Sequence, residues 1–376
     1  MLAALVFILS STSSAQLSLR PDARNNLVLE GRSCELLVRQ HRALCSWKRL
    51  TDEGFTLTAD AESRLERDCK KLSAQRARMV VATCLPAFAK EHHGKKLHED
   101  GPNCWGTAMG FKQLSSKPRF MWSEEMTYWM NTPLCRKLSP EEEKRPGDIL
   151  NVYGPEYLDV KERAEKDEGT AFIEALFPGR YQAPEQNVSG YTGFHRLLHS
   201  ETYLTPELAF GKESPNKLDR FNFHLLSETY GRPRDEEREC QENQTLAPHL
   251  REYQQKPRAI RGSKCAYFTT LHRCENFKTY FNSRNLSGDK ELIWKNVQAL
   301  QGLQEKLFSL VVSPGIKIEE CEARLLAGLA DVTLHRTREA LAQGPVDRDL
   351  EMLLAQEYFA AAAIKQSLSF ADLLPK

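Results

Sequence analysis

Apolar residues recur at three- and four-residue spacing in two parts of the chain, one near each end. The first part runs from about residue 26 to residue 90, with a break at 51–54. The second part contains three segments, 290–312, 320–343 and 347–368, separated by Pro or Gly. Because this spacing places apolar side chains on one face of an α-helix, it predicts helices in both parts. We interpret the last three segments as a small helical bundle.

The middle of the chain, roughly residues 96–232, has a different pattern. The stretches 104–111 (CWGTAMGF) and 123–138 are typical of helices. Short runs typical of β-strands follow at 149–154, 199–204 and 207–212, with Pro and Gly between them. A helical part followed by a run of strands predicts an α+β domain.

The first residues have the pattern of a secretory signal. An apolar run over residues 2–9 leads into small residues that end at Ala15, after which we expect cleavage. No Lys or Arg precedes the run, so the start lies upstream or the free amino terminus supplies the charge. A short buried N-terminal helix is the alternative. We expect an exported protein, periplasmic or extracellular, with no integral membrane segment after removal of the signal.

Composition narrows the choice of partners. The 376 residues carry a net charge of +1, and 27% of them are charged. This balance does not indicate a basic surface for nucleic acid or for an acidic membrane. We expect no nucleic-acid partner and no cofactor, and we leave open a protein partner for the C-terminal helices.

Ten cysteines in an exported chain predict disulfide bonds. Two pairs in the N-terminal helical part are spaced by 11 and 15 residues, which brings the members of each pair to one helix face. Two antiparallel helices joined by nested bridges would satisfy both spacings. The nested bridges would be Cys34–Cys84 and Cys45–Cys69.

Two further cysteines suggest a third disulfide bond. Cys265 and Cys274 are close enough in the sequence to form a local bridge. If Cys104 is set aside, nine cysteines remain, so at least one other thiol is free or pairs outside the chain.

Cys104 stands where a reactive cysteine is expected. Gly101-Pro102-Asn103 ends a loop, and Cys104 begins the apolar stretch predicted as a helix. A helix N-terminus stabilises a thiolate, and a histidine from a distant strand can act as its base. The bulky Trp105 beside the cysteine could shield it from water.

A histidine follows at the required place. Pro146-Gly147-Asp148 predicts a turn before an apolar strand, with Asp148 closing the turn through the backbone. His199 begins a later strand, which is followed by a turn and another strand. A cysteine helix, a Pro-Gly-Asp turn with its strand, and a histidine strand are the order of a papain-like core.

The chain resembles the papain-like peptidases in these features. Cys104-Trp105 matches their Cys-Trp dipeptide. The Pro-Gly-Asp turn, followed by His199 with Tyr203 four residues later, is similar to the NlpC-type peptidases, which cleave stem peptides of peptidoglycan. The resemblance covers about residues 96–232. It implies a core of an N-terminal helix and an antiparallel sheet.

The resemblance also implies residue roles. Cys104 would be the nucleophile and His199 the general base. A third polar residue on the following strand would orient the imidazole, and Lys212, Glu213 and Ser214 occupy that stretch. We prefer Glu213, because a carboxylate fixes the ring tautomer and stabilises the imidazolium. Backbone N–H groups at the helix start would bind the oxyanion.

These inferences divide the chain into four parts. Residues 1–15 are the signal peptide, 16–95 a disulfide-stapled helical segment, 96–232 the papain-like catalytic domain and 233–376 a C-terminal helical domain. We expect a cysteine hydrolase that cleaves amide bonds, in peptidoglycan stem peptides, through an acyl-enzyme. Whether water or an amine accepts the acyl group stays open.

Three alternatives remain. His195, four residues before His199, would share its face of a regular strand and could be the base instead. A metal site is conceivable around residues 91–100, although their spacing matches no standard zinc motif, and we expect a polar loop instead. An inactive papain-like scaffold would have Cys104 buried or bonded, for example to Cys135. The candidate ligands of the metal site are Glu91, His92, His93, His98, Glu99 and Asp100.

Overall fold

The computed structural model describes residues 18–21, 27–31, 77–80, 87–95, 97–112, 117–139, 141–155, 185–188, 191–205, 208–212, 214–226, 268–313, 318–343 and 346–373. The chain forms two compact units, Met1–Lys90 and Glu91–Lys376. The described helices and antiparallel strands agree with the predicted α+β class. The signal peptide and the two nested disulfides lie outside the described residues.

Unit 1 contains an antiparallel sheet where helices were predicted. Its strands are β1 (Ser18–Pro21), β2 (Leu27–Gly31) and β3 (Ala77–Val80), in the order β1-β2-β3. The prediction of helix at 27–31 and 77–80 is therefore wrong. The two strands pair across almost fifty residues, and such long-range pairing overrides a local helical pattern. The short helix α3 (Ala87–His92) follows.

Unit 2 is built on one antiparallel sheet. Its order is β4-β10-β5-β7-β8-β9, and β6 pairs with β7. The strands predicted at 149–154, 199–204 and 207–212 are confirmed. The strand bounds are β4 Cys135–Lys137, β5 Ile149–Pro155, β6 Glu185–Val188, β7 Tyr191–Tyr203, β8 Leu208–Gly211, β9 Asn222–Leu225 and β10 Phe268–Cys274.

Strand β10 comes from beyond the segment that resembles the peptidases. It lies between β4 and β5, and Cys274 is the register partner of Cys135. These two cysteines form a disulfide across 139 residues. The predicted Cys265–Cys274 bridge is therefore wrong. Strand register, and not distance in the sequence, brings the two sulfurs together.

Two helices precede the sheet in unit 2. The helix α4 spans Cys104–Phe111, and α5 spans Ser123–Met130. The helix predicted over 123–138 thus ends early, and its last residues form β4. Pro133 explains the stop, because a proline disfavours helical backbone at the residue before it.

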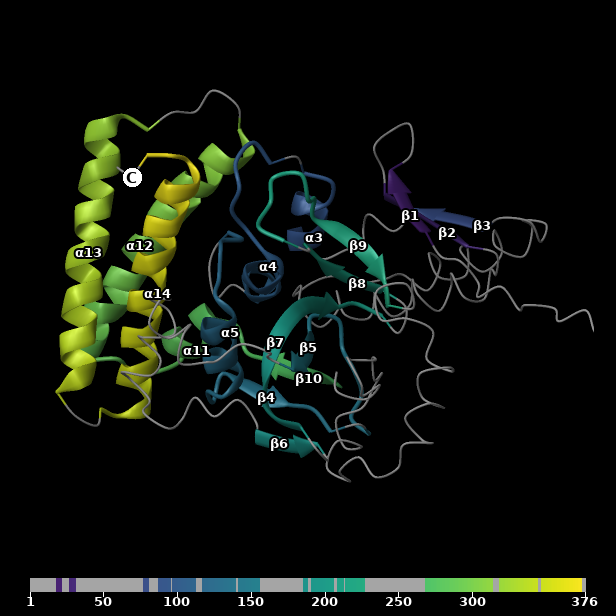
Figure 1. Cartoon of the computed structure of the whole chain (residues 1–376), viewed down its shortest axis with the longest axis horizontal. Helices are drawn as coiled ribbons and strands as arrows, with labels where there is room; N and C mark the ends of the chain where they lie inside the picture. The colour runs from purple at the N-terminus through teal and green to yellow at the C-terminus, as the bar shows by residue number, and fades with distance from the viewer. Residues whose placement is uncertain are drawn as a thin grey trace, which may run out of the picture. The chain divides into compact units, whose positions relative to one another are not determined.

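The three C-terminal helices are confirmed. They are α12 (Asp289–Val312), α13 (Glu320–Ala342) and α14 (Arg348–Phe370), preceded by the short α11 (Phe277–Asn282). Figure 1 shows α12, α13 and α14 grouped together, and α14 packs against both α12 and α13. Helix α14 is buried along most of its length, and its side chains share one core with those of α4, α5 and β5. None of the described helices is long and apolar enough to span a membrane.

Candidate active site

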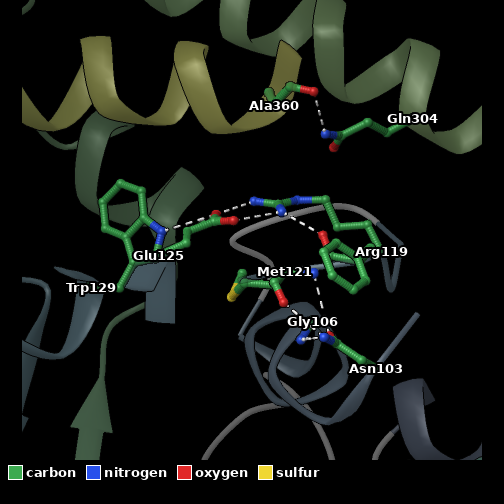
Figure 2. Close-up of polar contacts among 9 residues, drawn as sticks. Asn103, Gly106, Arg119, Met121, Glu125, Trp129, Gln304 and Ala360 are labelled. Atoms are coloured by element: carbon green, nitrogen blue, oxygen red, sulfur yellow. Dashed lines mark hydrogen bonds and ion pairs between the residues drawn. The ribbon is translucent and has the colours of Figure 1, made fainter. Parts of the chain in front are cut away.

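Cys104 is the first residue of α4, and the asparagine before it caps the helix. The Oδ1 atom of Asn103 accepts hydrogen bonds from the N–H of Gly106 at 3.1 Å and of Met121 at 3.3 Å. Its Nδ2 donates to the carbonyl of Met121 at 2.7 Å. Figure 2 shows this cap between the helix start and the neighbouring loop. The predicted helix start at Cys104 is confirmed, and the cap fixes where it begins.

The loop over α4 approaches the helix too closely for any side chain at position 106. A Cβ atom on Gly106 would lie 1.7 Å from the carbonyl oxygen of Arg119. A buried ion pair holds this loop, with Arg119 Nη1 2.9 Å from Glu125 Oε2, and Trp129 Nε1 donates to Glu125 at 3.3 Å (Figure 2). Hydrogen bonds and a buried ion pair therefore connect the start of α4, the loop and α5 beside Cys104.

His199 on β7 faces the cysteine. Helix α4 packs against β7 and β8, and the Cys104 thiol and the His199 ring share a hydrogen bond. Cys104 is 3% exposed, whereas the side chain of His199 is 21% exposed. The imidazole is thus the part of the pair that solvent reaches.

Glu201 is the partner of the imidazole on its other side. Nε2 of His199 lies 3.4 Å from Oε1 of Glu201, whose side chain is fully buried. Residues two apart on a strand project from the same face, which explains the contact. With Nε2 directed to the carboxylate, Nδ1 is the ring nitrogen left for the thiol.

The electrostatics of the three groups favour a charged imidazole. Burial lowers the pKa of His199, but its hydrogen bonds to Cys104 and Glu201 and the charges of both groups raise it more. The resulting pKa is about 10, against an ordinary value of 6.5. A charged imidazolium facing the buried carboxylate of Glu201 is the state of His199 that this arrangement favours.

The sulfur of Cys104 is in no disulfide bond. Cys135, the partner that an inactive scaffold could offer it, is bonded to Cys274. The other free thiol in the described part of the chain is Cys321, which is exposed on α13. Cys104 thus retains the chemical group needed for nucleophilic attack, in a buried setting.

Among the described residues, the carboxylate beside His199 is that of Glu201, on β7 itself, and the three candidates expected after the following strand are placed as follows. Glu213 lies outside the described residues. Lys212 donates to the carbonyl groups of Ser214 and, at 2.8 Å, of Asn216, and Ser214 Oγ donates to Asp219. The side chains of Lys212 and Ser214 thus hold their own loop together.

The resemblance does not point to Glu201, because it implies an orienting residue on the strand that follows the histidine strand. The signal was present in the sequence as a His-x-Glu spacing on a predicted strand.

His195 is the alternative to His199 as the base, on the argument that the two side chains would share one face of a regular strand. His195 is on β7, but the register between β5 and β7 shifts between its position and that of His199. An extra residue in one strand breaks the alternation of faces, so alternation no longer indicates that His195 and His199 share a face. The orientation of the His195 side chain lies outside what the structure describes.

The residues of the conceivable metal site have other neighbours. The His92 ring lies 5.5 Å from that of Phe221, and the His93 ring lies 4.8 Å from that of Phe223. Glu91 pairs with Lys117 at 2.5 Å. In the described ranges, no three His, Cys, Asp or Glu side chains gather in a way that could hold a metal ion.

The Pro-Gly-Asp turn lies beside the end of β7. Gly147 has a φ of +92°, which favours glycine, and its N–H donates to the carbonyl of Tyr203 at 2.7 Å. Asp148 Oδ2 accepts the N–H of Arg145 at 2.7 Å, which closes the turn as expected. The turn and Tyr203, both parts of the motif in the sequence, are thus neighbours in space.

Comparison of the chain with protein-family models, with curated proteins and with solved structures found no match. The site geometry therefore carries the functional argument.

Proposed function

We propose that this protein is an exported cysteine hydrolase with a papain-like core that cleaves amide bonds by Cys–His catalysis. One observation carries the proposal. The free thiol of Cys104, at the start of a capped helix, hydrogen-bonds to His199, whose Nε2 faces the buried carboxylate of Glu201. Nucleophile, base and orienting group are in contact in the order that such chemistry requires.

The proposed reaction has two stages. The Cys104 thiolate attacks the amide carbonyl carbon, and the backbone N–H groups at the start of α4 bind the resulting oxyanion. The His199 imidazolium gives its proton to the leaving amine as the C–N bond breaks, which leaves a thioester on Cys104. Neutral His199 then takes a proton from water, whose oxygen attacks the thioester. The acid product leaves, and thiolate and imidazolium are restored. Glu201 stabilises the imidazolium whenever it is present.

The arrangement of elements supports a papain-like core. A helix that begins at the cysteine packs against an antiparallel sheet whose neighbouring strand carries the histidine. The sequence motif adds the cell-wall substrate class, since the Pro-Gly-Asp turn and Tyr203 resemble the NlpC-type peptidases. On this basis we propose peptidoglycan stem peptides as substrates, in the periplasm or outside the cell.

Incubation with purified peptidoglycan tests the proposal. The full chain should release free amino groups and peptide fragments that mass spectrometry assigns to one amide bond. Cys104→Ala should release none while it keeps the thermal unfolding midpoint of the wild type. Equal release by both proteins, or none by the wild type, would contradict the proposed function.

An inactive binding protein is the second candidate, because the thiol of Cys104 is buried. In that case wild type and Cys104→Ala would both bind peptidoglycan in a pull-down assay, and neither would cleave it.

A further inference from the structure

Helix α13 has an exposed apolar face. Leu325, Leu329 and Val332 are 73%, 46% and 67% exposed. They are spaced by four and three residues, so they share one face of the helix. In the described part of the chain, three of the five large apolar side chains that are exposed therefore gather within about two turns of one helix.

The opposite face of α13 belongs to the protein core. Its buried residues include Ala323, Leu326 and Ala330, and the helix packs against α14. Figure 1 shows α13 at the outer side of the group of three helices. The helix thus has two apolar faces, and the core uses one of them. An exposed apolar patch of this kind is typical of a surface that binds another protein.

The exposed face is nearly symmetric along the helix. Gly328 lies near its centre, and a Cβ atom there would meet no atom within 4 Å. Leu325 and Val332 lie at similar distances on either side of this glycine. Because glycine has no side chain, a second helix backbone can come close at this point. A face with this symmetry suits contact with a second copy of itself, in which the same patch is used twice.

Opposite charges lie at the two ends of the face. Glu322 is exposed at the N-terminal end, and the side chain of Arg336 is 53% exposed at the C-terminal end. One Arg336 nitrogen donates to Glu357, and a guanidinium has further N–H donors. The other charged residues near the face are paired within the molecule: Glu320 with Arg324, Asp331 with Lys365 and His335 with Glu339.

An antiparallel pair of α13 helices would match both the apolar and the charged positions. With Gly328 at the crossing point, Leu325 lies opposite Val332 of the second copy. Glu322 then lies beside Arg336 of the second copy. A parallel pair would instead place each residue opposite itself, so that two Glu322 carboxylates would repel each other. The charge pattern therefore favours the antiparallel arrangement.

We propose that the exposed face of α13 is an interface between two copies of this chain, paired antiparallel about a twofold axis near Gly328. The face is short, which places the contact among the smaller interfaces that proteins form. We therefore expect a reversible dimer with a Kd on the order of 10 μM. The inference is independent of the proposed chemistry, because Cys104, His199 and Glu201 lie on other elements.

Sedimentation velocity of the full chain tests the dimer at concentrations from about 1 to 200 μM, a range that brackets the expected Kd. Leu325→Glu places a charge in the apolar contact and should raise the Kd roughly tenfold or more. Leu292→Glu is the matched control, because Leu292 is 58% exposed on α12, outside this face. It should keep the Kd of the wild type. Val332→Glu is the second variant and should act like Leu325→Glu.

Cys321 reports the orientation of the two copies. Its thiol is free and exposed, one turn before Leu325 on the same face. In the antiparallel dimer the two Cys321 residues lie about 22 Å apart along the helix axis, at about 1.5 Å per residue. This distance is too long for a disulfide. Mild oxidation should therefore produce no Cys321–Cys321 bridge, whereas Cys321→Ser combined with Leu329→Cys should form a bridge across the twofold axis.

Glu322→Lys tests the charge pairing, because it places a second cation beside Arg336 of the other copy. It should raise the Kd roughly fivefold at low salt and less at high salt. A Kd that Glu322→Lys leaves unchanged at low salt would contradict the antiparallel arrangement.

Wild type that stays monomeric up to about 200 μM overturns the inference. A dimer that persists in both Leu325→Glu and Val332→Glu also overturns it, since another surface then forms the contact. A dimer that Leu292→Glu weakens equally does the same. A disulfide between two Cys321 residues in the wild-type dimer would show a parallel pair and overturn the antiparallel arrangement. Circular dichroism of each variant confirms that its helices are retained.

Discussion

Nε2 of His199 lies 3.4 Å from Oε1 of Glu201, two residues further along the same strand. This contact directs one ring nitrogen to a buried carboxylate and leaves the other for the thiol of Cys104. It makes β7 the source of both the base and the group that orients the base.

Glu201→Gln should lower kcat/KM on a cleaved peptide by roughly 10²- to 10⁴-fold, because the neutral amide no longer stabilises the imidazolium and permits the wrong tautomer. The measurement is steady-state hydrolysis with the fragments quantified by chromatography. Glu142→Gln removes a carboxylate paired with Arg136 at the surface and should retain full activity. Full activity in Glu201→Gln would remove Glu201 from the site.

The alkaline limit of activity follows from the pKa of His199, which its contacts with Cys104 and Glu201 raise to about 10 in spite of burial. Acylation needs the imidazolium as the acid that protonates the leaving amine. We therefore expect hydrolysis to persist through neutral pH and to fall as the pH rises through about 10. If activity instead fell as the pH rose through about 6.5, His199 would have the pKa of an imidazole that lacks these partners. In Glu201→Gln the limb should move to lower pH.

Gly106→Ala should destabilise the protein by about 1–3 kcal/mol, because the new methyl group would meet the carbonyl oxygen of Arg119 at 1.7 Å. Gly328→Ala is the matched control, since the same change on α13 meets no atom within 4 Å. It should stabilise the protein by about 0.5–1 kcal/mol. Urea unfolding of both variants gives the comparison, and equal stabilities would contradict the tight approach of the loop to α4.

The lowered pKa of His272 on β10 leads us to expect that the protein loses stability in acid. Burial, with a smaller contribution from the charge of Lys137, lowers its pKa from 6.5 to about 4. Its Nδ1 lies 3.2 Å from Nδ2 of Asn151, an arrangement that suits the neutral ring. Between pH 6.5 and 4 the unfolded chain binds a proton that the folded chain does not. Stability should therefore fall over this range by up to about 3 kcal/mol.

The measurement for His272 is the free energy of unfolding in urea at several pH values. In His272→Gln the part of the pH dependence due to this ring should disappear. The same acid loss in wild type and variant would show that other groups cause it.

The parts of the fold that depend on local pattern could be predicted from the sequence. The three C-terminal helices, the helix start at Cys104 and three strands of the main sheet were predicted because each depends on periodicity, capping or turn residues over a short stretch. Strands β3 and β10 were not, because their partners are far away in the sequence. The Cys135–Cys274 bridge was missed for the same reason, since it exists only where β10 lies beside β4.

The candidate site was predictable in part for the same physical reason. Cys104 could be found because the residues before it are typical of a helix start. His199 could be found because the residues around it have the pattern of a strand. Glu201 carries a signal only once β7 is accepted as a strand, and its burial depends on the strands around it. The shifted register near His195 could not be predicted, because the sequence does not show where an extra residue interrupts the pairing of β5 with β7.

The most direct test of the central claim is the alkylation rate of Cys104 against pH in wild type and His199→Ala. It is measured in the non-reduced protein by peptide mass mapping, with Cys321 as the reference thiol. An ordinary thiol has a pKa of about 8.5. We expect Cys104 in the wild type to react well below that pH, and we expect His199→Ala to lose this reactivity. An unreactive Cys104, or one that His199→Ala leaves unchanged, would contradict a Cys–His catalytic pair.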